Sequence, residues 1–228
     1  TRFEVGFPIG YFIGYQTDGI FQSQEEIDNA SVYQPGAQVG DLRFVDVDGD
    51  GEINFSNNDD KTMLGSPIPK FMLGSVLGFN IFGIDISTNL YAALGHKIVR
   101  NYERQQPYAN QLGYVLDRWT VDNPSNENPR VTTSATRNGV FSDYFVEDGS
   151  YLRVRNVQIG YVFPKNISNK LGSDYLRIYF SANNLFTLTN YMGYDPDIGS
   201  AGGALSSGID YGFYPQARTI MGGINIKF

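Results

Sequence analysis

The carboxyl-terminal segment, residues 216–228, has the pattern that most restricts how this chain can fold. Its side chains alternate between two faces, and the series ends on an aromatic residue. A period of two places successive side chains on opposite sides of a β-strand. One apolar and one polar face is typical of a strand that spans a membrane, and also of a strand in a soluble β-sandwich. The first face consists of Ile220, Gly222, Ile224, Ile226 and Phe228.

The same alternation recurs along the chain and predicts an all-β, antiparallel protein. The two-residue link Phe82-Gly83 joins two of the alternating segments into a hairpin. A change of phase is expected near Asn156. With the last segment there are about six long strands, joined by tight turns and long loops in alternation, as in membrane barrels. The other predicted strands cover residues 8–15, 67–81, 83–95, 151–164 and 174–186.

Some segments are not predicted to be strands. Residues 23–29 have the pattern of a short helix, because Ser23 is an N-cap residue and Glu26 completes a capping box. A second helical stretch is expected around residues 108–118. Long loops inside a compact domain are unusual and tend to be functional. Long loops are expected at residues 97–150 and 187–215.

The predicted strands are too few to close a barrel by themselves. The smallest bacterial barrels have about eight strands, and every backbone group in lipid must be paired. We therefore expect partner strands from elsewhere. Because the chain starts at Thr1 within patterned sequence, we interpret it as a fragment, or as a cleavage product, of a longer exported protein.

Composition excludes several classes of protein. The chain lacks cysteine, so it has neither a disulfide framework nor a thiolate metal site. A net charge of −7, without a cluster of Lys and Arg, argues against nucleic-acid binding. No apolar run reaches about 18 residues, which excludes a transmembrane helix and leaves a transmembrane barrel open.

Residues 40–62 contain the one pattern with explicit ligand chemistry. Asp46, Asp48 and Asp50 stand at positions 1, 3 and 5 of an EF-hand-type loop, and Gly51 takes the sharp-turn position. Alternate residues point inward around such a turn, so their hard oxygen ligands surround a cation. Without a cation these carboxylates would repel one another. We predict a Ca²⁺ ion, with Mg²⁺ as the second choice, that makes the loop rigid.

The remaining ligands are less well defined by the pattern. Glu52 would offer its carbonyl oxygen and Asn54 its side chain, but Asn57 replaces the bidentate Glu at position 12. Asp59 or Asp60 takes that role if the loop is slightly longer. The alternative is a surface turn that binds nothing, since Asp, Asn and Gly dominate turns for their own reasons.

Catalytic motifs are absent from the sequence, and we predict that the chain is not an enzyme. The only histidine, His96, has no partners that a sequence can identify for a nucleophilic triad. Asp195 and Asp197 are interpreted as turn residues around Pro196, not as a glycosidase pair. Trp119 is predicted to anchor its loop by packing. The sequence identifies no substrate-binding residue.

Taken in series, several segments resemble the carboxyl-terminal part of the SusC/RagA family, the TonB-dependent outer-membrane transporters of Bacteroidetes. They occur in the family order and cover nearly the whole chain. The acidic loop resembles the family pattern DxNGDGxID, with Asp48 in place of the usual Asn and Asn54 in place of Asp. The segments are GYQTDGIFQSQEEI (14–27), GDLRFVDVDGDGEIN (40–54), LGSPIPKFMLG (64–74), VLDRWT (115–120), EDGSYLRVRNVQIGYVFP (147–164), LRIYFSANNLFTLTNYMGYDPD (176–197) and YPQARTIMGGINIKF (214–228).

This resemblance implies that residues 1–228 form the carboxyl-terminal part of an outer-membrane receptor barrel of about twenty-two strands with long extracellular loops. The parent would have an amino-terminal plug that this chain lacks. TonB would act through that missing region, and a SusD-like surface lipoprotein would cap the barrel. Family substrates are chiefly oligosaccharides, with peptides in some members. Phe228 would be the terminal aromatic residue that the barrel-assembly machinery recognises.

Two other interpretations compete with the importer. One is a soluble, Ca²⁺-stabilised β-sandwich that binds glycans, and the weaker one is a glycoside hydrolase. A sandwich buries its alternating apolar face, whereas a barrel turns that face outward to lipid. Exposed apolar rows in the first hairpin would therefore favour the importer. These rows are Phe71, Leu73 and Leu77 on one strand and Ile84, Ile86 and Leu90 on the other.

Overall fold

The computed structural model describes residues 1–103, 110–203 and 206–228, and these residues form two compact units. The first unit contains Thr1–Ile68, Lys97–Glu147 and Ile198–Gly212. The second contains Pro69–His96, Asp148–Asp197 and Phe213–Phe228. Within the described part of the chain, no helix is both long and apolar enough to cross a membrane.

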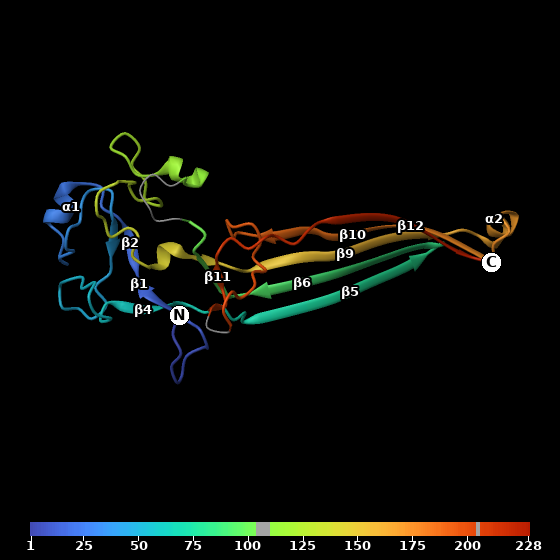
Figure 1. The fold of residues 1–228 in the computed structure, drawn as a ribbon, viewed down its shortest axis with the longest axis horizontal. Helices are drawn as coiled ribbons and strands as arrows, with labels where there is room; N and C mark the ends of the chain where they lie inside the picture. The colour runs from blue at the N-terminus through green and yellow to red at the C-terminus, as the bar shows by residue number, and fades with distance from the viewer. Residues whose placement is uncertain (104–109, 204–205) are drawn as a thin grey trace. The chain divides into compact units, whose positions relative to one another are not determined.

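The second unit is built on one antiparallel sheet of five long strands (Figure 1). Its strand order is β12-β10-β9-β6-β5, so sequence neighbours β5 and β6 form a hairpin at one edge and the carboxyl-terminal strand forms the other. The strands are β5 Phe71–Ile81, β6 Ile84–Leu94, β9 Tyr151–Val162, β10 Tyr175–Thr189 and β12 Thr219–Lys227. The predicted all-β, antiparallel character of these segments is confirmed.

The predicted hairpin turn at Phe82-Gly83 is also confirmed. Both residues have positive φ, 51° for Phe82 and 84° for Gly83. Two-residue turns with two positive φ values have the twist that matches paired strands, which explains the tight link. The connection from β9 to β10 is longer and contains the short helix α2, Lys165–Lys170.

The change of phase near Asn156 is confirmed as a pair of register shifts. Asn156 pairs with Asn89 and Val154 pairs with Leu90, so Arg155 has no partner in β6 at that point. The pairing of β9 with β10 also shifts between Asn183 and Phe186. A bulge of this kind inserts an extra residue into a strand and re-aims the side chains that follow. It returns the later apolar residues to the same face as the earlier ones.

The first unit consists of short strands and loops around a small aromatic core. The buried cluster contains Tyr15, Ile20, Leu42, Phe44 and Ile53, and Trp119 packs against it as the sequence predicts. β1 pairs with β4, β2 pairs with β3, and β7 lies between β8 and a short parallel partner, β11. These elements are β1 Phe12–Tyr15, β2 Thr17–Ile20, β3 Leu42–Phe44, β4 Lys61–Gly65, β7 Lys97–Arg100, β8 Val146–Asp148 and β11 Ile209–Asp210.

Two expectations about these elements need correction. Residues 8–15 do not form a sixth long strand, because only Phe12–Tyr15 is extended and it pairs within the first unit. In the stretch around 108–118, residues 108–109 lie outside the described part, and the rest contains only a 3₁₀ helix, η1 Gly113–Asp117. A second short 3₁₀ helix, η2 Asp143–Phe145, precedes β8.

The predicted helix at 23–29 is confirmed as α1, Gln24–Asp28. The Ser23 hydroxyl accepts a hydrogen bond from the Glu26 amide, as an N-cap residue should. The carboxylate of Glu26 accepts from the amide of Gln22 at 2.8 Å. The side chain of Glu26 in the capping box therefore binds the backbone amide of Gln22, the residue before the N-cap residue Ser23.

Candidate functional site

One face of the five-stranded sheet is a continuous apolar surface. Register places the apolar residues of all five strands in rows that cross the sheet. One row contains Ile224, Ile178, Tyr161, Ile84 and Ile81, and the next contains Gly222, Phe180, Ile159, Ile86 and Phe79. Directly opposed residues of an antiparallel sheet share a face, so these rows form one surface.

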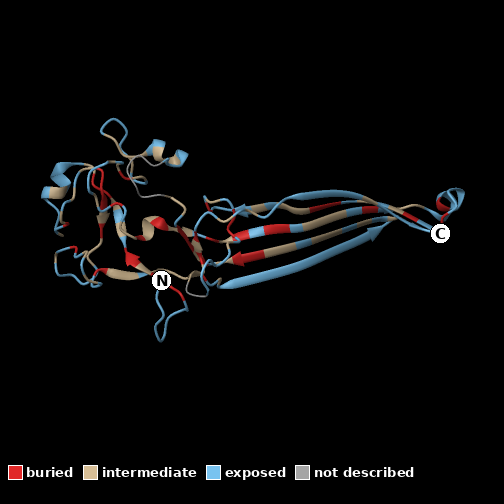
Figure 2. Cartoon of the chain, viewed as in Figure 1, coloured by how far each residue is buried: buried red, intermediate tan, exposed pale blue. Residues whose placement is uncertain are grey.

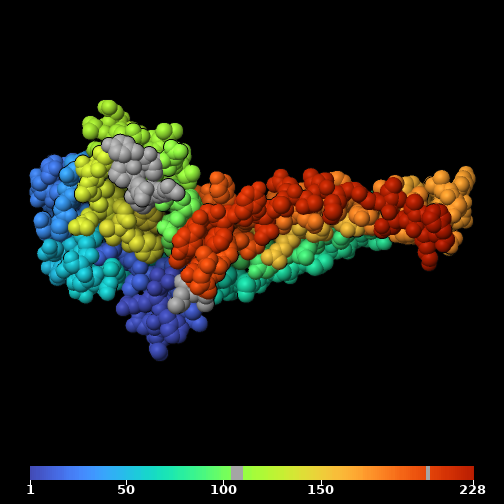
Figure 3. Space-filling view, in the orientation of Figure 1, coloured from blue at the N-terminus to red at the C-terminus, as the bar shows by residue number. Residues whose placement is uncertain are grey.

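This apolar face is the exposed face of the sheet. Phe180 is 52% exposed and Ile159 is 47% exposed, although both lie on strands with a neighbour on each side. Of the rows named in the first hairpin, all residues are exposed except Leu90, which is half-buried. Figure 2 shows β5 exposed along its whole length, and Figure 3 shows the side chains of β12, in red, along the other margin.

The opposite face is polar and largely satisfied by its own side chains. Arg177 on β10 reaches over β9 to Asp85 on β6 and forms a two-bond ion pair, with Nε 2.9 Å from Oδ1. Further along this face, the side-chain amide of Asn156 donates a hydrogen bond to the side-chain oxygen of Asn183 at 2.6 Å. On the three central strands, β6, β9 and β10, most side chains of this face are buried or half-buried, whereas those on the edge strands β5 and β12 are mostly exposed. In the centre of the sheet the apolar side chains are thus more exposed than the polar ones, which is the reverse of a soluble sheet.

Gly160 makes room for the ion pair that crosses β9. A Cβ atom at this position would lie 2.6 Å from Arg177 Nε and 2.6 Å from Asp85 Oδ1. We expect Gly160→Ala to break the pair and to lower the free energy of unfolding by about 1–3 kcal/mol, the usual cost of overpacking. Denaturant unfolding measures this loss. Gly78→Ala is the control, because nothing lies within 4 Å of its Cβ position, and an equal loss in both variants would contradict the explanation.

At one end of the polar face, Arg153 holds both acidic residues that flank Pro196. The buried Arg153 guanidinium forms an ion pair with Asp195, and its second nitrogen lies 3.3 Å from Asp197. Its Nε also donates to the Thr187 hydroxyl at 2.9 Å. These carboxylates therefore fix the loop after β10 to the sheet. The interpretation of the two residues as loop residues agrees with this geometry.

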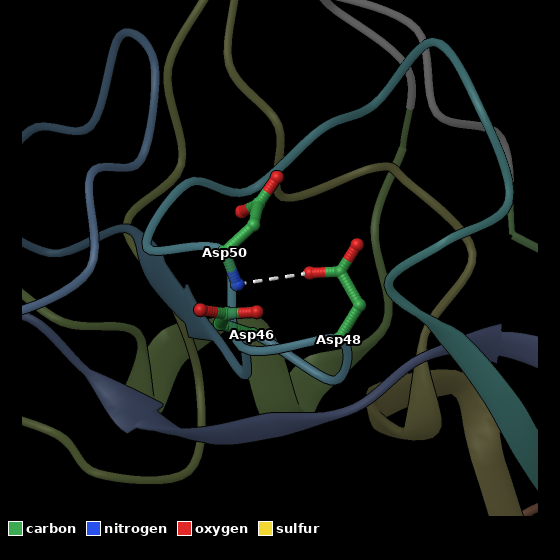
Figure 4. A group of neighbouring side chains, drawn as sticks. All are labelled: Asp46, Asp48 and Asp50. Carbon is green, nitrogen blue, oxygen red and sulfur yellow. Dashed lines mark hydrogen bonds between the residues drawn. The ribbon is translucent and has the colours of Figure 1, made fainter.

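The acidic loop brings three carboxylates together in a tight turn (Figure 4). Oxygen atoms of Asp46, Asp48 and Asp50 all lie within 4.8 Å of one another. The turn is fixed by backbone donors: Asp46 accepts from Gly49 at 2.7 Å and from Gly51 at 2.8 Å. The Asp50 amide donates to Asp48 at 3.2 Å. The three carboxylates are thus close enough to one another for one hard cation to contact an oxygen atom of each.

The other predicted ligands have different surroundings. Asp60 is buried and accepts hydrogen bonds from the amides of Val47 at 3.1 Å and Asn54 at 2.7 Å, so it closes the base of the loop. The Asn54 side chain accepts from the Ser56 amide, and Asp59 accepts from Asn57. The Glu52 amide donates to Asp50 at 2.8 Å. The structure thus separates a central group of three carboxylates from residues that support the turn.

Electrostatics differ within this group of three. The hydrogen bond from the Gly51 amide is the largest cause that lowers the pKa of Asp46 below its usual value. For Asp48, the bond from the Asp50 amide lowers the pKa, but desolvation and the nearby carboxylates outweigh it and the pKa is raised. A proton therefore competes with a bound cation for Asp48 at a higher pH than it does for Asp46.

A buried polar cluster next to this loop was not predicted. Asp41 accepts hydrogen bonds from Arg130 Nε at 2.6 Å, from Asn138 at 3.0 Å and from Thr136 at 3.1 Å. It is 2% exposed, so the ion pair with Arg130 is shielded from solvent. Because its partners are far away in the sequence, no local motif marks this cluster. It fixes the loop from Arg130 to Asn138 against the start of the acidic segment.

Another unpredicted feature is a cavity of about 640 Å³ in the first unit. Its lining mixes hydroxyl and amide side chains with apolar residues and the rings of Tyr114 and Tyr144. The guanidinium of Arg100 lies 4.9 Å from the Tyr114 ring centre and 5.0 Å from that of Tyr144, and it pairs with Glu147. Burial raises the pKa of the Tyr144 hydroxyl above its usual value, so it is a neutral hydrogen-bonding group at physiological pH.

Comparison with known proteins shows that the chain is similar to TonB-dependent receptors. It is 32% identical to TonB-dependent receptor P3 of Formosa agariphila over 98% of this chain and 22% of that protein. It is 26% identical to TonB-dependent receptor SusC of Bacteroides thetaiotaomicron over 95% of this chain and 20% of SusC. The chain thus spans about a fifth of the length of these relatives. No family model matches the sequence.

The fold of the chain is similar to that of solved RagAB structures. The structure of the RagAB peptide importer in its open-open state matches 99% of this chain and 23% of the solved chain, with a TM-score of 0.71 and 22% identity. A second RagAB peptide transporter structure matches 96% of this chain with a TM-score of 0.69. At this identity the likeness concerns the fold alone.

Proposed function

Because the chain belongs to the SusC/RagA family of TonB-dependent receptors, we propose that it is the carboxyl-terminal barrel portion of an outer-membrane nutrient importer. The importer takes up oligosaccharides or peptides, is energised by TonB through a plug-containing region outside this chain, and works with a SusD-like surface lipoprotein. It catalyses no reaction. The family relationship supports the class of activity, and the chain's own residues support its place in the membrane.

The exposed apolar face of the sheet is the observation that carries this proposal. In water, rows of exposed Ile and Phe side chains would be costly, at roughly 25 cal/mol for each Å² of apolar area. In lipid the same rows are the favourable side of the sheet. The soluble sandwich requires this face to be covered by a second sheet, yet Ile178 and Phe180 are exposed.

Strand length and sheet edges fit the same proposal. The five strands contain 9 to 15 residues, and a tilted transmembrane strand needs about 9–11. Strands β5 and β12 are the edges of this sheet. Because lipid tolerates no open edge, we propose that further strands of the parent protein pair with both, in a barrel of about twenty-two strands. Phe228 is proposed as the assembly signal.

An uptake assay tests the proposed activity. Cells that express the natural full-length protein with its SusD-like partner are expected to accumulate a labelled oligosaccharide or oligopeptide, because a closed barrel with a TonB-driven plug transports against a gradient. A panel of both substrate classes is required, since the sequence names neither. The matched control is the same strain without TonB. Uptake that is equal with and without TonB would contradict the proposal.

We further propose that the loop at 40–62 binds one Ca²⁺ ion through Asp46, Asp48 and Asp50. Glu52, Asn54, Asp59 and Asp60 complete or support the site. The three central carboxylates supply oxygen ligands in the spacing that Ca²⁺ prefers, and their mutual repulsion is relieved when the ion binds. The role of the ion is to hold the loop rigid.

Calorimetric titration tests the metal site. Asp48→Ala and Asp50→Ala are expected to abolish Ca²⁺ binding, because each removes one of the central ligands. Wild-type affinity is expected to fall as the pH is lowered, and the raised pKa of Asp48 means that its proton competes first. Asp18→Ala removes an exposed carboxylate elsewhere and serves as the control. Unchanged Ca²⁺ titrations in the Asp48 and Asp50 variants would contradict the proposed metal site.

A further inference from the structure

The connection between β9 and β10 has an unusual composition for this acidic chain. The connection itself, residues 163–174, contains Lys165, Lys170 and one acidic residue, Asp174, which directly precedes β10, although the whole chain has a net charge of −7. Both lysines are exposed. Ile167 and Leu171, four residues apart, are 41% and 63% exposed. Ile167 lies in α2 and Leu171 is its C-cap residue. Side chains at this spacing lie on the same side of a helix, so the two form an apolar stripe on an element that also carries both lysines.

This arrangement is held in place by the turn itself. Ser168 is buried, and its carbonyl oxygen accepts hydrogen bonds from the amide and the hydroxyl of Ser173, both at 3.1 Å. The Phe163 amide donates to Leu176 at 2.9 Å and closes the base of the connection. These bonds hold the turn in one conformation, in which Ile167 and Leu171 are both exposed. The exposed apolar residues are thus a fixed feature of the turn.

Exposed aromatic residues gather at the same end of the sheet as α2. Figure 1 shows α2 beyond the ends of the strands and beside the carboxyl terminus, where Phe228 is exposed. Phe82 in the β5–β6 turn is almost fully exposed, and Tyr161 and Tyr175 are also exposed. Aromatic rings of this kind are enriched where a membrane meets water. The apolar face of the sheet therefore ends in a zone with the composition of an interface.

We propose that α2 is an interfacial anchor that binds phospholipid headgroups at the end of the sheet where the β5–β6 turn lies. Ile167 and Leu171 enter the boundary of the acyl chains, and the ammonium groups of Lys165 and Lys170 bind lipid phosphates. Amphipathic elements bind membranes by buried apolar area together with attraction to anionic lipid. Lysine stems extend along apolar surface while the charge stays in the polar layer. This inference rests on the proposed membrane location of the sheet.

Site-directed fluorescence quenching tests the anchor. Because the chain has no cysteine, single-cysteine variants of it carry a fluorophore at one defined position. We use Leu171→Cys on the apolar stripe, Asn169→Cys on the opposite side of α2, and Phe180→Cys on the apolar face of the sheet. The natural full-length protein, with any cysteine outside this chain replaced, is reconstituted in nanodiscs that contain lipids brominated near the headgroup or deep in the chains. Iodide in the buffer reports exposure to water.

The expected pattern separates the anchor from the membrane location of the sheet. The label at position 171 is quenched several-fold more by shallow brominated lipid than the label at 169, which responds to iodide, and the label at 180 responds to the deep bromines. Equal iodide quenching at 171 and 169, with lipid quenching retained at 180, would overturn the anchor and leave the proposed function standing. Loss of lipid quenching at 180 as well would overturn both.

A second measurement tests the two lysines. Adding phosphatidylglycerol to phosphatidylcholine nanodiscs is expected to increase lipid quenching at position 171, because the ammonium groups attract anionic headgroups. The double variant Lys165→Gln/Lys170→Gln should lose this increase and keep the quenching seen in phosphatidylcholine alone. An undiminished increase in the double variant would overturn the assignment of headgroup binding to these lysines.

Discussion

Phe180→Arg is expected to prevent stable insertion of the protein into the outer membrane. Phe180 lies near the middle of β10 on the exposed apolar face, between Ile159 and Gly222 of the neighbouring strands. An arginine at the midplane of a transmembrane strand costs about 2–4 kcal/mol. Such a loss lowers the equilibrium constant for folding by more than about tenfold. The amount of folded protein in purified outer membranes, and its resistance to unfolding by denaturant, measure the effect.

Gln158→Arg provides the matched control. Gln158 lies on β9 next to Ile159, the residue that pairs with Phe180. The side chain of Gln158 lies on the polar face, opposite Ser181 and Ser87. An arginine there remains in a polar environment, so insertion and stability should stay close to those of the wild type. If both variants lose the same stability, or if Phe180→Arg loses none, the exposed apolar face is not in contact with lipid.

Asp41→Ala is expected to destabilise the first unit by about 3–5 kcal/mol. The substitution removes the carboxylate that pairs with the largely buried Arg130 and accepts from Asn138, and an uncompensated buried charge is strongly unfavourable. The loop between Arg130 and Asn138 should also lose its protection from proteolysis. Denaturant unfolding and limited proteolysis of the folded protein measure the two effects.

Asp18→Ala separates this effect from the general loss of an ion pair. Asp18 lies 2.6 Å from Arg43, but both side chains are well exposed. Exposed pairs contribute about 0–1 kcal/mol, so this variant should remain nearly as stable as the wild type. Equal losses in Asp18→Ala and Asp41→Ala would show that burial of the Asp41 cluster has no special role.

Features that depend on neighbouring residues were predictable from the sequence. Alternation in the segments around β5, β6, β9, β10 and β12 follows from the pleat of a strand, and the bulge near Asn156 is visible as a break in that alternation. The Ser23 cap and the Phe82-Gly83 turn are also local. The three central carboxylates of the acidic loop meet because they are separated by single residues around a turn.

Features built from distant residues were not predictable. Asp41 and its partner Arg130 are separated by 89 residues, and Asp85 and Arg177 by 92. No spacing rule connects such residues, because the chain path that joins them is set by tertiary packing. The length of residues 8–15 as a strand was overestimated for a related reason: a four-residue strand in the first unit has the same local composition as part of a long one.

A nitroxide scan along β10, from Leu176 to Asn183, tests the central claim most directly. Each position is labelled in turn in the membrane-reconstituted protein, and its accessibility to oxygen and to a water-soluble nickel complex is measured. Oxygen concentrates in lipid, so its accessibility should peak at the positions of Ile178 and Phe180, while the nickel complex reaches the alternate positions instead. A scan in which the nickel complex reaches Ile178 and Phe180, or in which the two-residue period is missing, would contradict a lipid-facing sheet.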